Sequence, residues 1–207
     1  MEEDSQVDDE EFKMTEEDYE EVLMAIRGFV YSGYYTAERI YEVVTEEMYE
    51  PEDIDVEWVR DRIAELFQAK LAEEKTWPAI TDCDRLDMAF EELNRSGIIA
   101  LQNAGMTQSD GWDDVREVYH ERGGRTSGIE GYCFYHGQDL ERVVMGDILY
   151  LRFGAMDQDE NHGVTVGKRI VAILKSHKFE PEWNETFQQS MHIRGIDWKR
   201  RSVPSGT

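Results

Sequence analysis

Residues 157–168, DQDENHGVTVGK, begin with oxygen-bearing side chains at every second position. A calcium loop of the helix-loop-helix type needs oxygen ligands at its first, third and fifth positions, glycine at the sixth and a bidentate glutamate at the twelfth. Asp157, Asp159 and Asn161 meet the first three requirements, but His162 stands at the glycine position and Lys168 at that of the glutamate. Because both diagnostic positions fail, the spacing argues against calcium.

The same stretch also has features of a phosphate-binding loop, which carries four residues between its glycines and a Ser or Thr after its lysine. Gly163 and Gly167 enclose three residues, and Arg169 follows Lys168. The loop is therefore one residue short and lacks the hydroxyl that binds magnesium. We interpret residues 157–161 instead as the acidic start of a helix, with Asn161 near the cap, because a helix N-terminus favours carboxylates.

A candidate for acid–base chemistry lies in GYCFYHGQDLE, at the end of an expected strand. His136 is a possible general base, with Asp139 or Glu182 fixing its tautomer, and His192 is a further polar group of the same expected cleft. The alternative is a structural role for His136. Cys133 lies three residues before His136 on the expected strand, so the two side chains point to opposite faces and that strand alone cannot make a nucleophile pair.

Two acidic segments are candidates for a metal site. Asp110 and Asp113, in NAGMTQSDGWDD, would form a magnesium site with Asp157 or Asp159 if the fold brought them together. Clustered carboxylates without paired bases are usually just solvated. We therefore predict no metal and no cofactor.

The chain has two cysteines, Cys83 and Cys133, too few for a disulfide framework and typical of a reducing compartment. We expect Cys133 in the core, as free cysteine is among the most buried residue types. The first residues of the chain, MEEDSQVDDEEF, are acidic and lack the apolar stretch of a secretory signal. No apolar run in the sequence approaches the length of a membrane span. These features favour a cytoplasmic location.

The net charge of −24 is unevenly distributed. Residues 14–75 hold eighteen acidic and six basic residues, and seven of the first eleven residues are acidic. A protein that binds nucleic acid or an anionic membrane directly needs basic residues against the phosphates, so both partners are disfavoured. A basic protein partner is favoured instead.

We expect residues 1–13 to be a disordered acidic tail, because they offer almost nothing apolar to bury. A helical part follows over residues 14–75. Thr15 and Asp18 form an expected capping box, and apolar residues at helical spacing predict three helices, punctuated by Gly33 and Pro51.

Pro78 changes the pattern, and Thr81 with Asp84 predicts a second capping box. Strands and helices then alternate through residue 201, with strands expected in GIIALQNAG, GYCFYHG, ILYLRFGA, FEPEWN and QSMHIRG. We predict an α+β protein in which the N-terminal helical part packs on a mixed, partly parallel sheet covered by helices. Residues 202–207 are expected to be a flexible tail.

Several strings in this region resemble an uncharacterised bacterial family defined as a domain of unknown function: WPAITDCDRLD, GIIALQNAG, GYCFYHGQDLE, LYLRFGA and FEPEW. The resemblance covers most of the chain after Met14 and implies no reaction. Some members have a cysteine-rich stretch after the strand that ends near Asn103. Here that stretch is AGMTQSDGW, so a thiolate metal site of that kind is not expected.

Two functions remain open at this stage. The first is a cytoplasmic acidic interaction protein, inhibitor-like or immunity-like, whose helical part binds a basic partner. The second is an enzyme or small-ligand binder that uses a cleft around His136 in the C-terminal part. A deep pocket that joins the polar candidates would favour the second function, and a flat acidic face would favour the first.

The loop analysis makes one prediction. Residues 157–168 should show no specific calcium binding, because the sixth and twelfth positions are occupied by His162 and Lys168. Titration calorimetry measures this directly. Calcium binding with micromolar affinity that is lost in both Asp157→Ala and Asp159→Ala would contradict it.

Overall fold

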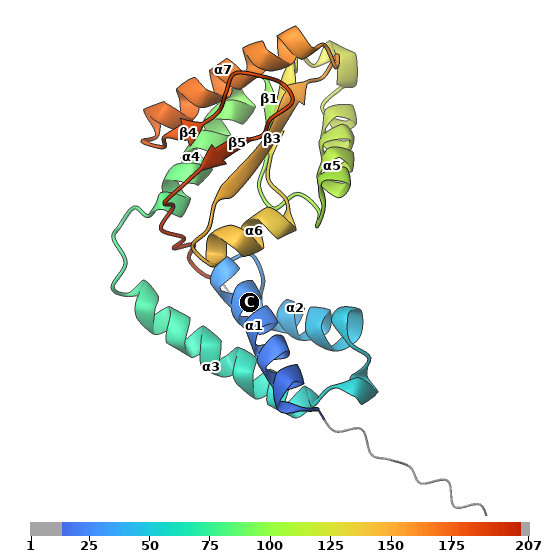
Figure 1. Ribbon diagram of the computed structural model, residues 1–207, viewed down its shortest axis with the longest axis vertical. Helices are drawn as coiled ribbons and strands as arrows, with labels where there is room; N and C mark the ends of the chain where they lie inside the picture. Colours follow the sequence, from blue (N-terminus) through green and yellow to red (C-terminus); the bar gives the residue numbers. More distant parts are fainter. Residues whose placement is uncertain (1–13, 204–207) are drawn as a thin grey trace, which may run out of the picture. The chain divides into compact units, whose positions relative to one another are not determined.

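The computed structural model describes residues 14–203 (Figure 1). The predicted disordered tail, residues 1–13, and residues 204–207 of the predicted flexible tail lie outside the described residues. The chain divides into two compact units between Lys75 and Thr76, and the second unit ends at Arg201. Within the described part of the chain, no helix is both long and apolar enough to cross a membrane.

The first unit is helical. It consists of α1 (Glu16–Ser32), α2 (Ala37–Glu42), the π-helical segment η1 (Val43–Met48), the short 3-10 turn η2 (Pro51–Asp53) and α3 (Val56–Glu74). The predicted capping box is confirmed, since the Asp18 amide donates to the Thr15 hydroxyl and the Asp18 carboxylate accepts from the Thr15 amide. The second helix, expected as one α-helix, changes to π-helical geometry at Val43.

Apolar residues at helical spacing on α1, α2 and α3 meet in one core, as the periodicity predicted. The buried members are Val22, Ile26, Val30, Ile40, Val44, Ile54, Val59 and Ile63. Acidic residues occupy exposed positions of the same helices, so the surplus negative charge of this unit is in contact with water.

The second unit contains a five-stranded sheet. Its elements are α4 (Asp82–Arg95), β1 (Ile98–Leu101), α5 (Gln108–Glu121), η3 (Gly124–Thr126), β2 (Gly131–Phe134), α6 (Gly137–Val144), β3 (Leu149–Ala155), α7 (Glu160–Ser176), β4 (Pro181–Glu182) and β5 (Met191–Ile193). The strand order is β1-β2-β3-β5-β4; β1 and β2 are parallel, and the other pairs are antiparallel. The predicted α+β class with a mixed, partly parallel sheet is confirmed.

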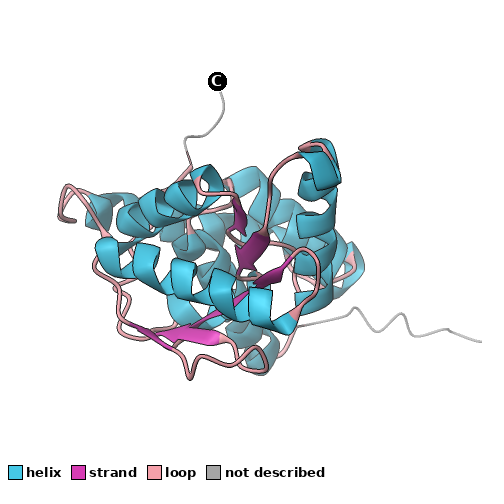
Figure 2. Ribbon diagram, turned by 90° about the horizontal axis from the view of Figure 1, so that it is seen from above, coloured by secondary structure: helices cyan, strands magenta, loops and turns pink. Residues whose placement is uncertain are grey.

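The two faces of the sheet differ. Helix α5 packs against the face that carries Ile99, Tyr132 and Phe134, in a cluster with Val115. Helices α4 and α7 contact β1 and β3 and also contact each other. In Figure 1 these two helices lie across the sheet from α5, and in Figure 2 the strands lie between helices. The alternation of side chains along the strands sends Cys133 away from the α5 face.

The end of the second unit is tied back to its start. Arg200 pairs with Asp87 through two contacts of 2.6 and 3.1 Å, and Arg201 donates to Asp84 at 2.9 Å. The run of basic residues after Trp198 is therefore neutralised within the unit. Ser202, which the sequence placed in a flexible tail, belongs to the first unit and donates twice to Glu74 at 2.8 Å.

Helix α5 begins at Gln108, because Thr107 and Asp110 form a third capping box. Gly111 then faces the sheet. A Cβ at this position would lie 2.5 Å from the ring of Phe134, so glycine permits the close approach of α5 to β2.

We predict that Gly111→Ala destabilises the protein by about 1–3 kcal/mol, because the added methyl group has to push α5 away from Phe134. Gly28→Ala in α1 is the matched control. A Cβ at Gly28 meets no atom within 4 Å, so alanine should stabilise its helix by about 0.5–1 kcal/mol. Urea denaturation measures both. Equal effects of the two substitutions would show that the approach at Gly111 is not tight.

Candidate functional site

His136 and Asp139 form a buried pair where β2 meets α6. The sequence placed His136 on the expected strand. In the structure, β2 ends two residues earlier, and His136 is the N-cap of α6. Its Nε2 lies 3.1 Å from Asp139 Oδ2, and its backbone N–H donates to the same oxygen at 3.4 Å. The side chains are 3% and 0% exposed. Asp139 therefore fixes the orientation of the imidazole, as the first of the two expected alternatives proposed.

Two arginines face the other oxygen of the same carboxylate. Arg142 Nη1 and Arg152 Nη2 each lie 3.6 Å from Asp139 Oδ1. Both guanidinium groups also lie against the ring of Tyr150, at 5.7 and 5.8 Å from its centre. A carboxylate without exposure to water needs such partners, because an unpaired buried charge is strongly unfavourable. Asp139 thus links α6 to β3.

Burial affects the pKa values of both members of the pair. It lowers the pKa of His136 from 6.5, against the opposing effect of Asp139, and favours a neutral imidazole. It raises the pKa of Asp139, against the opposing charges of Arg152, His136 and Arg142. When Nε2–H donates to Asp139, Nδ1 is left as an acceptor. This atom is buried and has no hydrogen-bond partner among the described residues.

Glu182 and His192 do not join this pair directly. They are partners across β4 and β5, and Glu182 binds Arg194 through both of its oxygens at 3.1 Å. The ring of His192 lies 4.6 Å from that of Tyr150, with which it is paired across β3 and β5. Glu182 therefore does not set the tautomer of His136. His192 is linked to the buried pair through Tyr150, whose ring both arginines contact.

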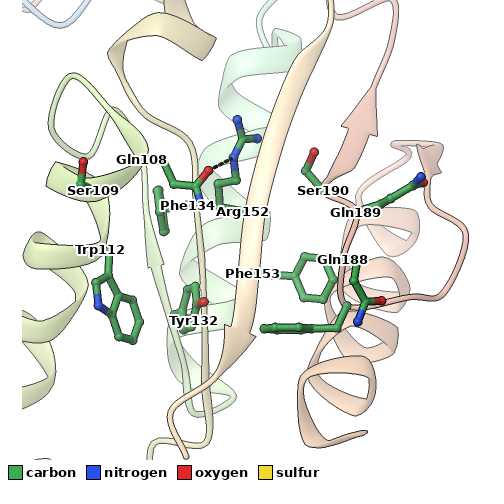
Figure 3. A pocket seen from close by; sticks show the side chains of 11 residues that line it. Gln108, Ser109, Trp112, Tyr132, Phe134, Arg152, Phe153, Gln188, Gln189 and Ser190 are labelled. Carbon is green, nitrogen blue, oxygen red and sulfur yellow. Dashed lines mark hydrogen bonds between the residues drawn. The ribbon is translucent and has the colours of Figure 1, made fainter. Parts of the chain in front are cut away.

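A cavity of about 690 Å³ begins beside α5 and extends past β3 to Phe153 and Phe187, whose rings lie against Gly167 and Gly163 of α7 (Figure 3). Helix α5 supplies one side, β2 and β3 supply the floor, and the segment before β5 supplies the other side. Its lining residues are Gln108, Ser109, Trp112, Tyr132, Phe134, Arg152, Phe153, Phe187, Gln188, Gln189 and Ser190. The four catalytic candidates from the sequence do not line it, so the expected cleft around His136 is displaced to the neighbouring Arg152.

Arg152 connects the cavity to the buried pair. Its side chain is 21% exposed, and its Nε donates to Gln108 Oε1 at 3.2 Å (Figure 3). Its Nη1 has no hydrogen-bond partner among the described residues. Among the described residues, Arg152 is the single charged residue of the lining, and no Asp, Glu, His or Cys joins it there. The arrangement offers one fixed cation among aromatic rings and neutral polar groups, which suits an anion with a flat apolar part.

The acidic metal candidates serve as helix caps and ion-pair partners. Asp110 closes the capping box of α5, and Asp113 pairs with Arg116 at 3.3 Å. Asp159, rather than Asn161, is the N-cap of α7. Over residues 14–203, no three His, Cys, Asp or Glu side chains gather in a way that could hold a metal ion. The magnesium site that would join the two acidic segments is therefore not formed by the fold.

Asp157 instead lies 2.5 Å from His162 Nδ1, in a second cavity of about 740 Å³ that is also lined by Arg125 and Arg169. A backbone hydrogen bond from Asp159 and the contact with His162 lower the pKa of Asp157, and Asp157 raises the pKa of His162. His162, which breaks the calcium pattern at the sixth position, thus occupies one oxygen that a cation would need.

Both cysteines are buried and free of disulfides. Burial raises the pKa of each thiol to about 12, for Cys83 and for Cys133. Neither is a reactive thiolate at neutral pH. The expectation that Cys133 belongs to the core is confirmed.

The sequence analysis missed the residues that line the cavity. One signal was available: LYLRFGA places a single arginine in an otherwise apolar strand. A charge at such a position needs a partner or a polar cavity. The aromatic residues Tyr132 and Phe134 gave no comparable signal, since alternating aromatic side chains are ordinary in a strand.

The fold and this site define a mixed α+β protein with an aromatic cavity beside its sheet that contains one arginine. The chain belongs to the family described as Domain of unknown function (DUF6891), which it matches over residues 15–202. No curated protein and no solved structure matches the chain.

The different surroundings of two histidines predict opposite shifts of their pKa values. His136 should titrate below 6.5, because burial disfavours its charged form, and His162 above 6.5, because Asp157 stabilises the imidazolium. His136 therefore contributes stability that is present above pH 6.5 and lost as pH falls through its folded pKa. The contribution of His162 has the opposite sign and is lost as pH rises through its folded pKa.

Proton NMR of the imidazole signals measures each pKa separately, with assignments from His136→Gln and His162→Gln. A His136 signal that titrates above 6.5, or one that moves together with that of His162, would contradict the proposed burial of the pair.

Proposed function

We propose that the second unit binds a small planar organic anion, with its ring in the aromatic cavity and its carboxylate or phosphate at Arg152. The observation that supports this proposal is the guanidinium of Arg152, which lines the cavity, donates to Gln108 and lies 3.6 Å from the buried carboxylate of Asp139. A cation held in place before the ligand arrives costs less to order on binding than a free side chain does.

The rest of the lining supports a flat apolar ligand. The ring centres of Trp112 and Tyr132 lie 4.9 Å apart, and those of Tyr132 and Phe134 lie 6.1 Å apart. On the opposite side, Phe153 and Phe187 lie 6.3 Å apart. Aromatic rings bind one another through offset-stacked or edge contacts over such distances. A cavity of about 690 Å³ also falls within the size range of small-molecule sites.

The lining favours binding over acid–base catalysis. General acid–base chemistry needs a titratable group within hydrogen-bonding distance of the reacting atom. The lining offers only Tyr132 and Arg152 as ionisable groups, and burial raises the pKa of Tyr132. His136 lies behind Arg152 and is almost fully buried, so we assign it a positioning role. A cytoplasmic location is part of this proposal and agrees with two free cysteines.

Replacing Arg152 with methionine should weaken the binding of indole-3-carboxylate or phenyl phosphate by about 10- to 100-fold, because a hydrogen bond to a charged group contributes about 1.5–3 kcal/mol. The binding of the neutral probe indole-3-carboxamide should change little. Isothermal titration calorimetry gives the affinities.

Arg142→Met is the matched control for this test. Arg142 lies at the same 3.6 Å from Asp139 and at a similar distance from Tyr150, but its side chain is 51% exposed and does not line the cavity. It should leave the affinity for the anionic probes within about twofold of the parent protein. Equal losses in Arg142→Met and Arg152→Met, or no preference for anions over the amide in the parent protein, would overturn the proposed function.

A further inference from the structure

A second candidate surface lies in the first unit and is independent of the cavity at Arg152. A groove of about 490 Å³ runs between the α2–η1 segment and α3. Its lining residues are Ala37, Glu38, Tyr41, Glu42, Glu46, Arg60, Ile63 and Ala64. All of them belong to the first unit.

The floor of this groove is apolar. Ala37 and Tyr41 come from α2, and Ile63 and Ala64 from α3. Ile63 is 3% exposed and belongs to the core, whereas Ala64 is exposed. A small side chain at position 64 therefore keeps the groove open. An apolar side chain from a partner would enter here and contact Ile63 and the ring of Tyr41.

One edge of the groove is acidic. Glu38, Glu42 and Glu46 follow one another at intervals of four residues, and all three line the groove. Arg39 pairs with Glu42 at 3.3 Å and with Glu47 at 2.6 Å. Glu38 and Glu46 have no cationic side chain within 4.0 Å in the described structure. Two carboxylates therefore remain available at the ends of this edge, one on each side of the partly neutralised Glu42.

Arg60, the cation among the groove residues, contacts Tyr41 rather than a glutamate. Arg60 lies 4.9 Å from the centre of the Tyr41 ring and donates to the Tyr41 hydroxyl at 3.3 Å. It covers the tyrosine from the α3 side and pairs with none of the three glutamates. The acidic edge is therefore not neutralised from the opposite side of the groove.

Glu46 lies on the π-helical segment. Segments of this kind are rare, have wider turns than an α-helix and occur often at functional sites. Here the change from α- to π-helical geometry at Val43 falls between Glu42 and Glu46, in the wall of the groove. The unusual geometry, the apolar floor and the acidic edge thus coincide.

We infer that this groove is the docking site of a basic amphipathic helix of a partner protein. A helix that lies along α2 and η1 would place an apolar stripe on the floor and its Lys or Arg residues against Glu38 and Glu46. Residues seven or eight apart on an α-helix face the same side and lie roughly 10–12 Å apart along its axis, so two basic residues at that interval can each face one of the two glutamates, which are eight residues apart. Docking of an amphipathic helix in an apolar groove is a common recognition mode.

Charge complementarity selects this partner over a second copy of the chain. Residues 14–75 hold eighteen acidic and six basic residues, and the whole chain carries −24. The basic run near the end of the second unit is paired with Asp84 and Asp87. Two copies would therefore repel one another, whereas a basic helix would be attracted before contact.

The test uses a fluorescently labelled peptide of about 18 residues, with leucines along one helical stripe and lysines on both edges. Fluorescence anisotropy measures its affinity for the full chain at about 150 mM salt, where distant surface charges are screened. We expect Glu38→Gln/Glu46→Gln to weaken binding by about tenfold or more. Ala64→Phe, which fills the groove without changing the charge, should weaken it by a similar factor.

The matched control is Glu17→Gln/Glu20→Gln, which removes the same two charges from exposed positions of α1 that do not line the groove. It should change the affinity by less than about twofold. A peptide whose leucines are replaced by serines should bind at least about tenfold more weakly. Circular dichroism of each variant checks that the first unit remains helical.

The control pair and the filled groove decide the result. Equal weakening by the two double variants would show attraction by total charge alone and would overturn the docking site. Unchanged affinity in Ala64→Phe would also overturn it, because the peptide would then lie elsewhere. Self-association that depends on Glu38 and Glu46, seen by analytical ultracentrifugation without peptide, would assign the groove to a second copy instead.

Discussion

The candidate site of the second unit depends on one buried carboxylate. Asp139 has no exposure to water, so its charge has to be matched inside the protein, and His136, Arg142 and Arg152 supply the partners. The enclosed partners His136 and Arg152 matter most, because a buried carboxylate that loses them keeps an uncompensated charge, whereas Arg142 is half-exposed and water can replace it. The same requirement positions Arg152 at the cavity. The positive charge of the cavity therefore follows from the need to match the buried charge of Asp139.

In this arrangement, one set of residues holds α6 to β3, and a different residue presents a cation to the cavity. Asp139 and His136 are enclosed and hold α6 to β3, whereas Arg152 reaches from the enclosed cluster into the cavity. Arg142, which contacts the same oxygen, remains half-exposed on α6. The two arginines are thus equivalent toward Asp139 and different toward a ligand. Which of them contacts a ligand is decided by strand β3, since its alternation directs Arg152 to the α5 face beside Phe134.

Much of the fold follows from local sequence signals. Two capping boxes, at Thr15 and Thr81, begin helices where they were predicted, because a hydroxyl followed three residues later by a carboxylate satisfies free backbone amides in a way that few other conformations do. A third box, at Thr107, was not predicted, although it has the same spacing. It begins α5 at Gln108, whose side-chain oxygen accepts from Arg152.

The site itself was less accessible from sequence, for a physical reason. His136 and Asp139 are three residues apart, so their contact could be predicted from the sequence. Arg152 reaches Asp139 through the pairing of strands, which local spacing does not encode. Glu182 was equally plausible as a partner of His136, and its contact with Arg194 across two short strands removes it. Contacts within one turn of a helix were predictable, and contacts between elements were not.

The two proposed surfaces require opposite things of the same strongly acidic chain. A net charge of −24 opposes the approach of an anion, so a site for one needs a cation fixed close to the ligand, as Arg152 is by its contacts with Asp139 and Gln108. The groove of the first unit needs no such cation, because the surrounding charge already favours a basic helix. Its specificity has to come from shape, that is, from the small side chain of Ala64 and the buried Ile63 beneath the acidic edge. Surplus charge alone attracts any cation, and the apolar floor is what would restrict the groove to one kind of segment.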